Sequence, residues 1–282
     1  MKQILTLFAI ALFVSGCIID PPPPPPGGLT SCSSDPHSPE SQSCLEHQGN
    51  PNSPQKALVV GNGNYEYSPL PNPTNDARDM TNTLVNLGFY VTRAQNLDKQ
   101  TMDKVIKDFS QRLSGAKVEV ALFYFSGHGA QVNGKNFLIP TDNNKIKVED
   151  DLEKQAVSTN TTLAMMEKTD ADFNIMILDA CRDNPYRGGA KSLSRGLARW
   201  TSGGGGTVIA HAADSGQQAL EGDGNGLYTK YLLKELTENP HRRIDDLLIE
   251  VRKSVISKSK GKQKPWTEVS ISELICLGGC RK

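Results

Sequence analysis

The sequence predicts an α/β protein in which helices cover both faces of a mostly parallel β-sheet. From residue 56 onward, short apolar runs recur along the chain, and such runs are typical of strands that are buried on both faces. Segments with apolar residues at helical spacing separate these runs. Strands that alternate with helices favour an open parallel sheet, because each helix carries the chain back along the sheet.

Each expected strand is a short run dominated by apolar residues. The runs lie at residues 57–60, 90–92, 118–125, 173–178 and 207–210. The first run is wholly apolar, as expected for a strand inside the sheet. The third and fourth runs end in sequences rich in polar residues and glycine, which places those residues at the carboxyl edge of the sheet.

The expected helices lie at residues 74–87, 102–113, 228–236 and 244–256. In the first helix, Ala77, Met80 and Leu84 share one face, and Gly88 provides a stop signal. In the second helix, apolar residues recur at intervals of three and four from Met102 onward. About 225 residues are enough for one such core.

Composition excludes several classes of protein. The 282 residues include 31 Lys or Arg and 31 Asp or Glu, so the formal net charge is zero. Proteins that capture nucleic acid usually present a clearly basic face, so we expect no nucleic-acid partner. No apolar stretch reaches the roughly 18 residues of a membrane-spanning helix, and an apolar content of 37% is too high for a wholly disordered chain.

The first 16 residues are predicted to be a signal peptide. Lys2 is followed by the mostly apolar residues 4–14 and then by Ser15-Gly16-Cys17. This ending resembles the bacterial lipoprotein signal, in which the cysteine is lipidated and becomes the new N-terminus. The resemblance implies attachment at Cys17 to a membrane of the bacterial cell envelope, and Ile18 favours the outer membrane. A plain signal peptide is the alternative.

Residues 17–55 are predicted to be a tether between the lipid and a domain at residues 56–282. Residues 21–26 are all proline, and six residues of polyproline II span roughly 19 Å. The rest of the segment is rich in Ser, Pro, Asn and Gly, and it has few large apolar residues to offset the entropy lost on ordering. The proline run could instead be a ligand for an aromatic groove.

Two chemically reactive residues follow predicted strands. His128 lies between two glycines after residues 118–125, and Cys181 follows residues 173–178 closely. If these strands are neighbours, the imidazole favours the thiolate form of the cysteine, which is the nucleophile. A single histidine or cysteine at such a position is more often structural, so the argument rests on the pair.

These residues belong to motifs that resemble the caspase-like superfamily of cysteine peptidases. Its caspase signature is Gln-Ala-Cys followed by Arg, Gln or Gly and then Gly, with a histidine about 50 residues upstream. Two segments carry the match, Ser126-Gly127-His128-Gly129 and Asp179-Ala180-Cys181-Arg182-Asp183. Asp179 stands where the signature has Gln, and Asp183 stands where it has Gly. Further matching segments are Asn75-Asp76-Ala77 and residues 212–217.

The match covers roughly residues 56–256 and is closer to the bacterial and metacaspase branch than to animal caspases. It implies a three-layer α/β/α sandwich. It also implies that Cys181 attacks the scissile carbonyl and that His128 acts as general acid and base. Backbone N–H groups of Gly129 and Cys181 would form the oxyanion hole.

The same resemblance places Asp76, Ser126 and Asp179 in the primary substrate pocket. Two carboxylates in one pocket suit a Lys or Arg side chain, so the expected substrate is a peptide or protein with a basic P1 residue. The alternative role for Asp76 is stabilisation of a helix N-terminus. The alternative for Asp179 is a hydrogen-bonded carboxylate at a strand end.

No cofactor or metal is expected. Calcium activates some metacaspases, but Glu149-Asp150-Asp151 does not match their acidic cluster, and a solvated loop is the simpler interpretation. The pattern Gly61-Asn62-Gly63-Asn64 is too short to indicate a nucleotide site. Arg195 and Arg199 are possible self-cleavage points, although surface charge is the preferred interpretation. His211 is not included among the catalytic residues.

Six cysteines are present, and disulfides are expected outside the cytoplasm. With Cys17 assigned to lipid, the simplest pairs are Cys32 with Cys44 and Cys276 with Cys280, although four cysteines allow three connectivities. These pairs leave Cys181 unpaired, as a nucleophile must be.

The sequence therefore predicts a lipid-anchored cysteine endopeptidase that cleaves after Arg or Lys. One alternative is a catalytically silent lipoprotein of the same fold that binds peptides or partner domains. A flavodoxin-like hydrolase of small molecules, with Cys181 remote from His128, is a third hypothesis. The sequence sets no expectation for the oligomeric state.

Overall fold

The computed structural model describes residues 29–32, 43–115, 117–132, 134–180, 206–214, 219–220 and 222–280. The predicted signal peptide, Cys17 and the proline run lie outside the described residues. Cys181, Arg195 and Arg199 lie outside them as well.

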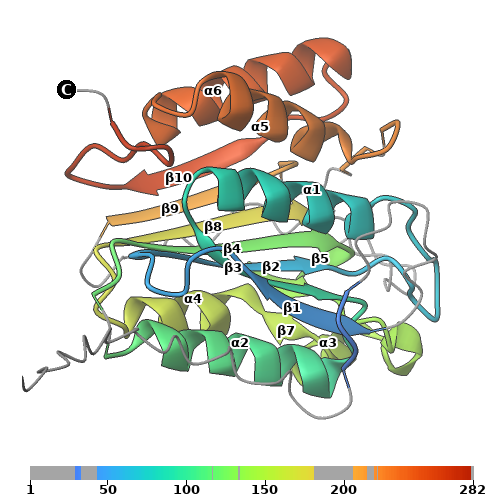
Figure 1. Cartoon of the computed structure of the whole chain (residues 1–282). Helices are drawn as coiled ribbons and strands as arrows, with labels where there is room; N and C mark the ends of the chain where they lie inside the picture. The colour runs from blue at the N-terminus through green and yellow to red at the C-terminus, as the bar shows by residue number, and fades with distance from the viewer. Residues whose placement is uncertain are drawn as a thin grey trace, which may run out of the picture.

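A seven-stranded sheet forms the centre of the domain (Figure 1). Its strands, in spatial order, are β1 (Cys44–Gln48), β3 (Tyr90–Gln95), β2 (Gln55–Gly61), β4 (Val120–Gly127), β8 (Phe173–Ala180), β9 (Gly206–His211) and β10 (Trp266–Ser270). The five inner strands run parallel to one another, and β1 and β10 pair antiparallel at the two edges. The expected mostly parallel sheet is confirmed.

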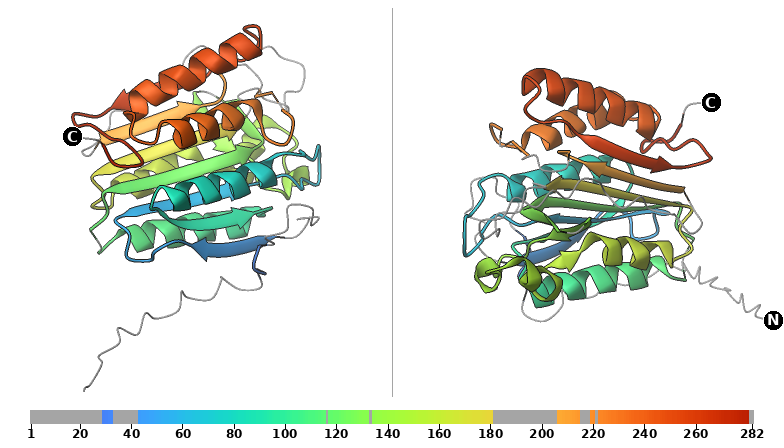
Figure 2. Two further views of the ribbon diagram at one scale, coloured as in Figure 1. Left: turned by 45° about the horizontal axis from the view of Figure 1, so that its top comes forward. Right: turned by 180° about the vertical axis from the view of Figure 1, so that it is seen from behind.

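Helices cover both faces of this sheet, which gives three layers (Figures 1 and 2). One face carries α1 (Pro73–Asn86), α5 (Leu227–Glu238) and α6 (Ile244–Lys258), and the other carries α2 (Lys99–Leu113) and α4 (Thr159–Glu167). Apolar side chains of the inner strands alternate between the two faces and pack into a separate core on each side. The four expected helices correspond to α1, α2, α5 and α6.

The sequence analysis did not predict several short elements. They are β5 (Gly129–Val132), β6 (Lys135–Leu138), β7 (Val157–Ser158) and α3 (Leu152–Gln155), together with the 3₁₀ turns Asn143–Lys145 and Glu149–Asp151. The strands β5, β6 and β7 form a second, antiparallel sheet. Strands of two to four residues are too short to show a period, and α4 contains three threonines, which are poor helix formers.

Strand β1 lies in the segment that we expected to be tether. It pairs with β3, and a Cys32–Cys44 disulfide joins it to the preceding segment. Leu45 is buried to 2% exposure in the core beside α2. Backbone pairing and the cross-link stabilise a segment whose own apolar content is small, so the folded domain begins before residue 56.

The second expected disulfide, Cys276–Cys280, is present after β10. Both simplest pairings are thus confirmed. Within the described ranges, no helix has the length and apolar character that crossing a membrane requires.

Candidate active site

The two predicted reactive positions follow neighbouring strands. Strands β4 and β8 are paired in parallel, with Ser126 opposite Asp179 and Gly127 opposite Ala180. The next residue along β4 is His128, and the next along β8 is Cys181, which itself lies outside the described residues. The carboxyl ends of these strands therefore meet at one point of the sheet edge, where ligands bind in open α/β sheets.

A tyrosine from the loop after β2 holds the turn that carries His128. The Tyr65 hydroxyl accepts a hydrogen bond from the His128 backbone N–H at 2.7 Å and donates one to the Ile139 carbonyl at 3.2 Å. The Tyr65 ring also lies against the imidazole, with centroids 4.4 Å apart. Gly127 has φ +154°, and a Cβ there would lie 2.4 Å from the Tyr65 hydroxyl, so this approach requires glycine.

The imidazole of His128 has a defined orientation. Its Nε2 lies 2.6 Å from the carbonyl oxygen of Ser68. A carbonyl only accepts hydrogen bonds, so Nε2 carries the proton and Nδ1 is the proton acceptor of the neutral ring. Ser68 has φ +60°, a left-handed conformation that is uncommon for serine and turns its carbonyl toward the ring. Burial lowers the pKa of His128, and the bond to Ser68 partly opposes that shift.

A cavity of about 260 Å³ opens beside His128. Its lining is Leu70, Pro73, Asp76, Ser126, Gly127, His128, Asp179, Ala219, Leu220 and Gly226. The structure therefore brings Asp76, Ser126 and Asp179 together with His128, although they come from α1, β4 and β8. Asp76 is 1% exposed and Asp179 is 6% exposed. Two buried acids therefore line the same cavity as His128.

The two carboxylates share a buried environment that favours a proton. Burial is the largest cause and the charge of Asp179 the second, and together they raise the pKa of Asp76 to about 8. Hydrogen bonds from the Ser126 hydroxyl, at 2.8 Å, and from the Gly226 N–H, at 3.0 Å, oppose this shift. The pair of carboxylates therefore favours a bound proton when no cation lies between them.

The first turn of α5 supplies further donors to the acids. The Thr229 N–H and hydroxyl both donate to Asp179 Oδ2, at 3.1 and 2.6 Å. Gly226, immediately before α5, donates to Asp76. The partial positive charge of this helix N-terminus lies where the carboxylates meet, so it favours their ionised forms. The alternative role of Asp76, stabilisation of its own helix, does not explain these contacts across the fold.

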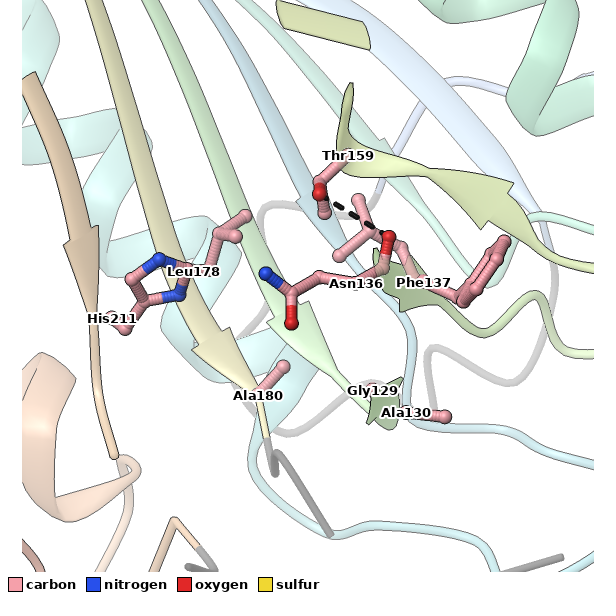
Figure 3. Close-up of a pocket in the computed structure, with 9 residues that line it drawn as sticks. Gly129, Ala130, Asn136, Phe137, Thr159, Leu178, Ala180 and His211 are labelled. Carbon is pink, nitrogen blue, oxygen red and sulfur yellow. Dashed lines mark hydrogen bonds between the residues drawn. The ribbon is translucent and has the colours of Figure 1, made fainter. Parts of the chain in front are cut away.

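Gly129 begins β5 on the other side of His128. It lines a small hollow with Ala180, Asn136, Thr159 and His211 (Figure 3). In this view the Asn136 side chain extends from β6 toward β8, and the Thr159 hydroxyl donates to the Asn136 carbonyl at 3.2 Å. His211 is buried on β9, and it does not line the acidic cavity.

The acidic run Glu149-Asp150-Asp151 forms a short 3₁₀ turn away from the cavity. Asp151 accepts bonds from the backbone N–H groups of Lys147 and Val148 and so stabilises its own turn. In the part of the chain that the structure describes, no group of three His, Cys, Asp or Glu side chains could hold a metal ion.

Four residues of this site were missed by the sequence analysis: Tyr65, Ser68, Gly226 and Thr229. One signal near the first two was the segment Gly61-Asn62-Gly63-Asn64, which we considered only as a nucleotide motif. The segment has a structural role in the loop instead. Asn96 Oδ1 accepts bonds from the backbone N–H groups of Gly63 and Asn64, and Asn62 Oδ1 accepts one from the Leu97 N–H. Gly226 and Thr229 lie about 50 residues from Asp179 and had no local motif.

Comparison with known proteins identifies related sequences. The profile of the caspase domain, peptidase family C14, matches residues 54–275. The chain is 30% identical over 226 residues to the human mucosa-associated lymphoid tissue lymphoma translocation protein 1, covering 77% of this chain and 26% of that protein. The mouse homologue is 30% identical over 238 residues, covering 81% and 27%. The chain thus spans about a quarter of the length of these curated relatives.

Structural comparison supports the same conclusion for the fold. The crystal structure of caspase-1 from Spodoptera frugiperda has a TM-score of 0.59 and 18% sequence identity, and the match covers 82% of this chain and 93% of that one. Together with the profile match over most of the chain, the seven-stranded sheet and its flanking helices show that the chain belongs to the caspase family, with a cysteine peptidase domain.

Proposed function

We propose that this protein is a cysteine endopeptidase that cleaves peptide bonds after Arg or Lys. The observation that carries the proposal is the pair of buried carboxylates, Asp76 and Asp179, in a cavity that also reaches His128. A buried pair of like charges requires a proton or a cation between them, and a basic P1 side chain supplies that cation. The cavity, at about 260 Å³, is large enough for a Lys or Arg side chain.

In the proposed mechanism, Cys181 gives its thiol proton to Nδ1 of His128, and the resulting thiolate bonds to the carbonyl carbon of the P1 residue, so that the carbonyl oxygen becomes an oxyanion. Backbone N–H groups of Gly129 and Cys181 stabilise that charge. His128 then donates its proton to the leaving amine as the amide bond breaks, which leaves a thioester. Water hydrolyses the thioester while His128 accepts its proton, and the thiolate is restored. The bond from Nε2–H to Ser68 supports this role because it makes Nδ1 the atom that exchanges protons.

Peptide cleavage tests the proposal directly. We expect the wild-type protein to cleave fluorogenic peptides with Arg or Lys at P1, and to leave peptides with Gln or Asp at P1 largely intact. Assays with calcium and with a chelator determine whether the ion is needed. The Cys181→Ala variant should lose both cleavage and labelling by a thiol-reactive probe with an Arg side chain.

Two results would contradict this proposal. Binding of Arg peptides without turnover, at any calcium concentration, would favour the silent binding module. Turnover of small esters that Arg peptides do not inhibit would favour the small-molecule hydrolase.

We also propose that Cys17 is lipidated and tethers the domain to a membrane of the bacterial cell envelope. Of the two membranes, Ile18 favours the outer one. The supporting feature is the sequence 4–17 alone. Two or more acyl chains give stable anchoring where one chain does not. We expect the full chain to incorporate an alkyne-labelled fatty acid and to fractionate with outer membranes, and the Cys17→Ala variant to do neither. Labelling that persists in Cys17→Ala would overturn the assignment.

A further inference from the structure

We infer that Thr229 is a positioning residue that holds Asp179 for a basic P1 side chain and so determines specificity. This inference rests on the proposed function. It concerns a residue that contacts neither the substrate nor the reacting atoms and acts only through the acid.

Thr229 binds one oxygen of Asp179 with two donors. Its backbone N–H lies 3.1 Å and its hydroxyl 2.6 Å from Asp179 Oδ2, and the side chain is fully buried. Two bonds from one residue to one oxygen define both the position and the rotation of the carboxylate. Hydrogen bonds to an ionised acceptor are among the stronger ones in proteins, particularly where water is excluded.

Tyr124, on β4 beneath the cavity, orients the Thr229 hydroxyl. The two hydroxyl oxygens lie 2.5 Å apart. Thr229 has one hydroxyl hydrogen, which it gives to Asp179, so Tyr124 donates to Thr229. Tyr124 is itself fully buried. The chain of donors runs from Tyr124 through Thr229 to Asp179 and ends on the carboxylate.

Thr237, an exposed threonine of the same helix, shows what a helical hydroxyl does without such a role. Thr237 Oγ1 donates to the Leu233 carbonyl one turn earlier, at 2.8 Å, which is the usual local bond of a helical threonine. Thr229 instead directs its hydroxyl to an acid on a strand 50 residues away in sequence. Thr237→Val therefore provides a control for the same substitution on α5 at an exposed position away from the acids.

The neighbouring Gly226 shows how little room the acids have. A Cβ at this position would lie 2.9 Å from Asp179 Oδ2 and 3.3 Å from Asp76 Oδ2. Both carboxylates thus pack against the backbone at the start of α5, where the Gly226 N–H donates to Asp76. Small rotations of Asp179 would therefore change the distance between the acids and the space left for a cation.

The elements that pack around Asp76 and Asp179 each contribute ionisable groups. Asp79 lies one turn along α1 and accepts a bond from the Asn225 side chain. Tyr124 lies on β4, His128 follows β4, and Tyr228 is buried on α5. Burial is the largest cause that raises the pKa of both tyrosines, so they remain neutral in the range where the acids titrate.

Steady-state kinetics of Thr229→Val tests the inference, because valine keeps the shape and removes the hydroxyl. The substrates are two peptides that differ only in Arg or citrulline at P1, since citrulline is nearly the same shape without charge. We expect Thr229→Val to raise KM for the Arg peptide about tenfold and to leave kcat nearly unchanged. A change of about tenfold corresponds to the loss of one hydrogen bond to a charged group. KM and kcat for the citrulline peptide should change little.

The pH dependence of KM provides a second readout. The Thr229 hydroxyl favours the ionised acid pair, so its removal should move the fall in KM for the Arg peptide to higher pH. Thr229→Ser should restore wild-type values, and Thr237→Val should retain them. If Thr229→Val does not fold, as judged by thermal melting, Tyr124→Phe tests the same chain of donors and should give a smaller change in the same direction.

Three outcomes would overturn the inference. If KM for the Arg peptide is unchanged in Thr229→Val, Thr229 does not determine specificity, and the proposed function still stands. Equal losses on the Arg and citrulline peptides, with no shift in pH profile, would indicate a structural role alone. Failure of the wild-type protein to cleave the Arg peptide would overturn the proposed function and this inference with it.

Discussion

Two buried clusters of charge in this domain differ in how their charges are balanced. At the β1 edge of the sheet, Arg93 Nε lies 2.7 Å from Glu46 Oε1, and their side chains are 2% and 18% exposed. At the carboxyl ends of the strands, Asp76 and Asp179 are both buried but are acids of the same sign. The first pair balances itself, while the second does not.

The difference distinguishes a structural contact from the proposed binding site. A buried cation beside a buried anion needs no third partner, and the pair joins β1 to β3. Two buried carboxylates reach a low energy only when a proton or a cation joins them, which accounts for the raised pKa of Asp76. Unbalanced buried charge in a cavity therefore indicates a ligand, and balanced buried charge indicates architecture.

The largest expected effect is on specificity. Asp76→Asn removes one of the two charges that a basic P1 residue would meet, while retaining the size of the side chain. We expect kcat/KM for an Arg peptide to fall about 100-fold, roughly 3 kcal/mol, since a buried guanidinium then lacks one ionic partner. The matched citrulline peptide should lose much less. An equal loss on both peptides would show that Asp76 maintains the fold and not the preference for charge.

The second expected effect is on stability, and the two clusters should respond with opposite signs. Glu46→Gln leaves the Arg93 charge buried without its carboxylate partner, so the free energy of unfolding should fall by about 3 kcal/mol. Peptide cleavage should not change, because Glu46 lies at the far edge of the sheet. Asp76→Asn should instead raise the free energy of unfolding at pH 8 by on the order of 2 kcal/mol.

The sign for Asp76 follows from its pKa. The folded-state pKa is raised to about 8, against an ordinary value near 4, so the folded protein holds the proton more tightly. That contribution to stability is complete below about pH 4 and is lost as the pH rises toward 8. Chemical unfolding of both variants at pH 5 and pH 8 measures the free energy of unfolding. If Asp76→Asn raises it as much at pH 5 as at pH 8, the raised pKa of Asp76 is contradicted.

The smallest expected effect comes from a neutral contact in the site. Tyr65→Phe removes the hydroxyl that accepts the His128 N–H but keeps the ring against the imidazole. A neutral hydrogen bond contributes about 1 kcal/mol, so we expect kcat to fall about fivefold on Arg and citrulline peptides alike. If the preference between the two peptides changes, Tyr65 acts on the acidic cavity as well as on His128, which contradicts this prediction.

The parallel sheet and its main helices could be predicted because their apolar periods are long and regular. The strands β2, β4 and β8 are dominated by apolar residues, and α2 repeats its apolar residues with a helical period. Strand β1 could not be predicted in the same way, because its sequence, Cys-Leu-Glu-His-Gln, has one large apolar residue. Its order depends on a disulfide and on pairing with a strand more than 40 residues away.

The residues of the candidate site also fall into two groups, those that could be predicted from the sequence and those that could not. His128 and Cys181 closely follow apolar strands, so the rule that parallel strands present their carboxyl ends at one edge predicted that they meet if those strands are neighbours. The family resemblance, and not this rule, added Asp179 to the site. Tyr65 and Thr229 come from a loop and a helix with no local motif. Their contacts with His128 and Asp179 exist only after distant segments pack, and residues 63 and 50 positions apart cannot signal one another through local periodicity.

The order of residues along this chain was therefore sufficient to predict a parallel sheet with helices on both faces and to show the family motifs, because these depend on local period and spacing. It left three cysteine connectivities open, and the structure selected the two simplest pairs. Packing of α1 and α5 against the strand ends determined the raised pKa of Asp76 and the donors on Asp179, and the Ser68 carbonyl in the loop before α1 determined the tautomer of His128. Burial and electrostatic coupling are properties of a three-dimensional neighbourhood, and no segment of the chain carries them alone.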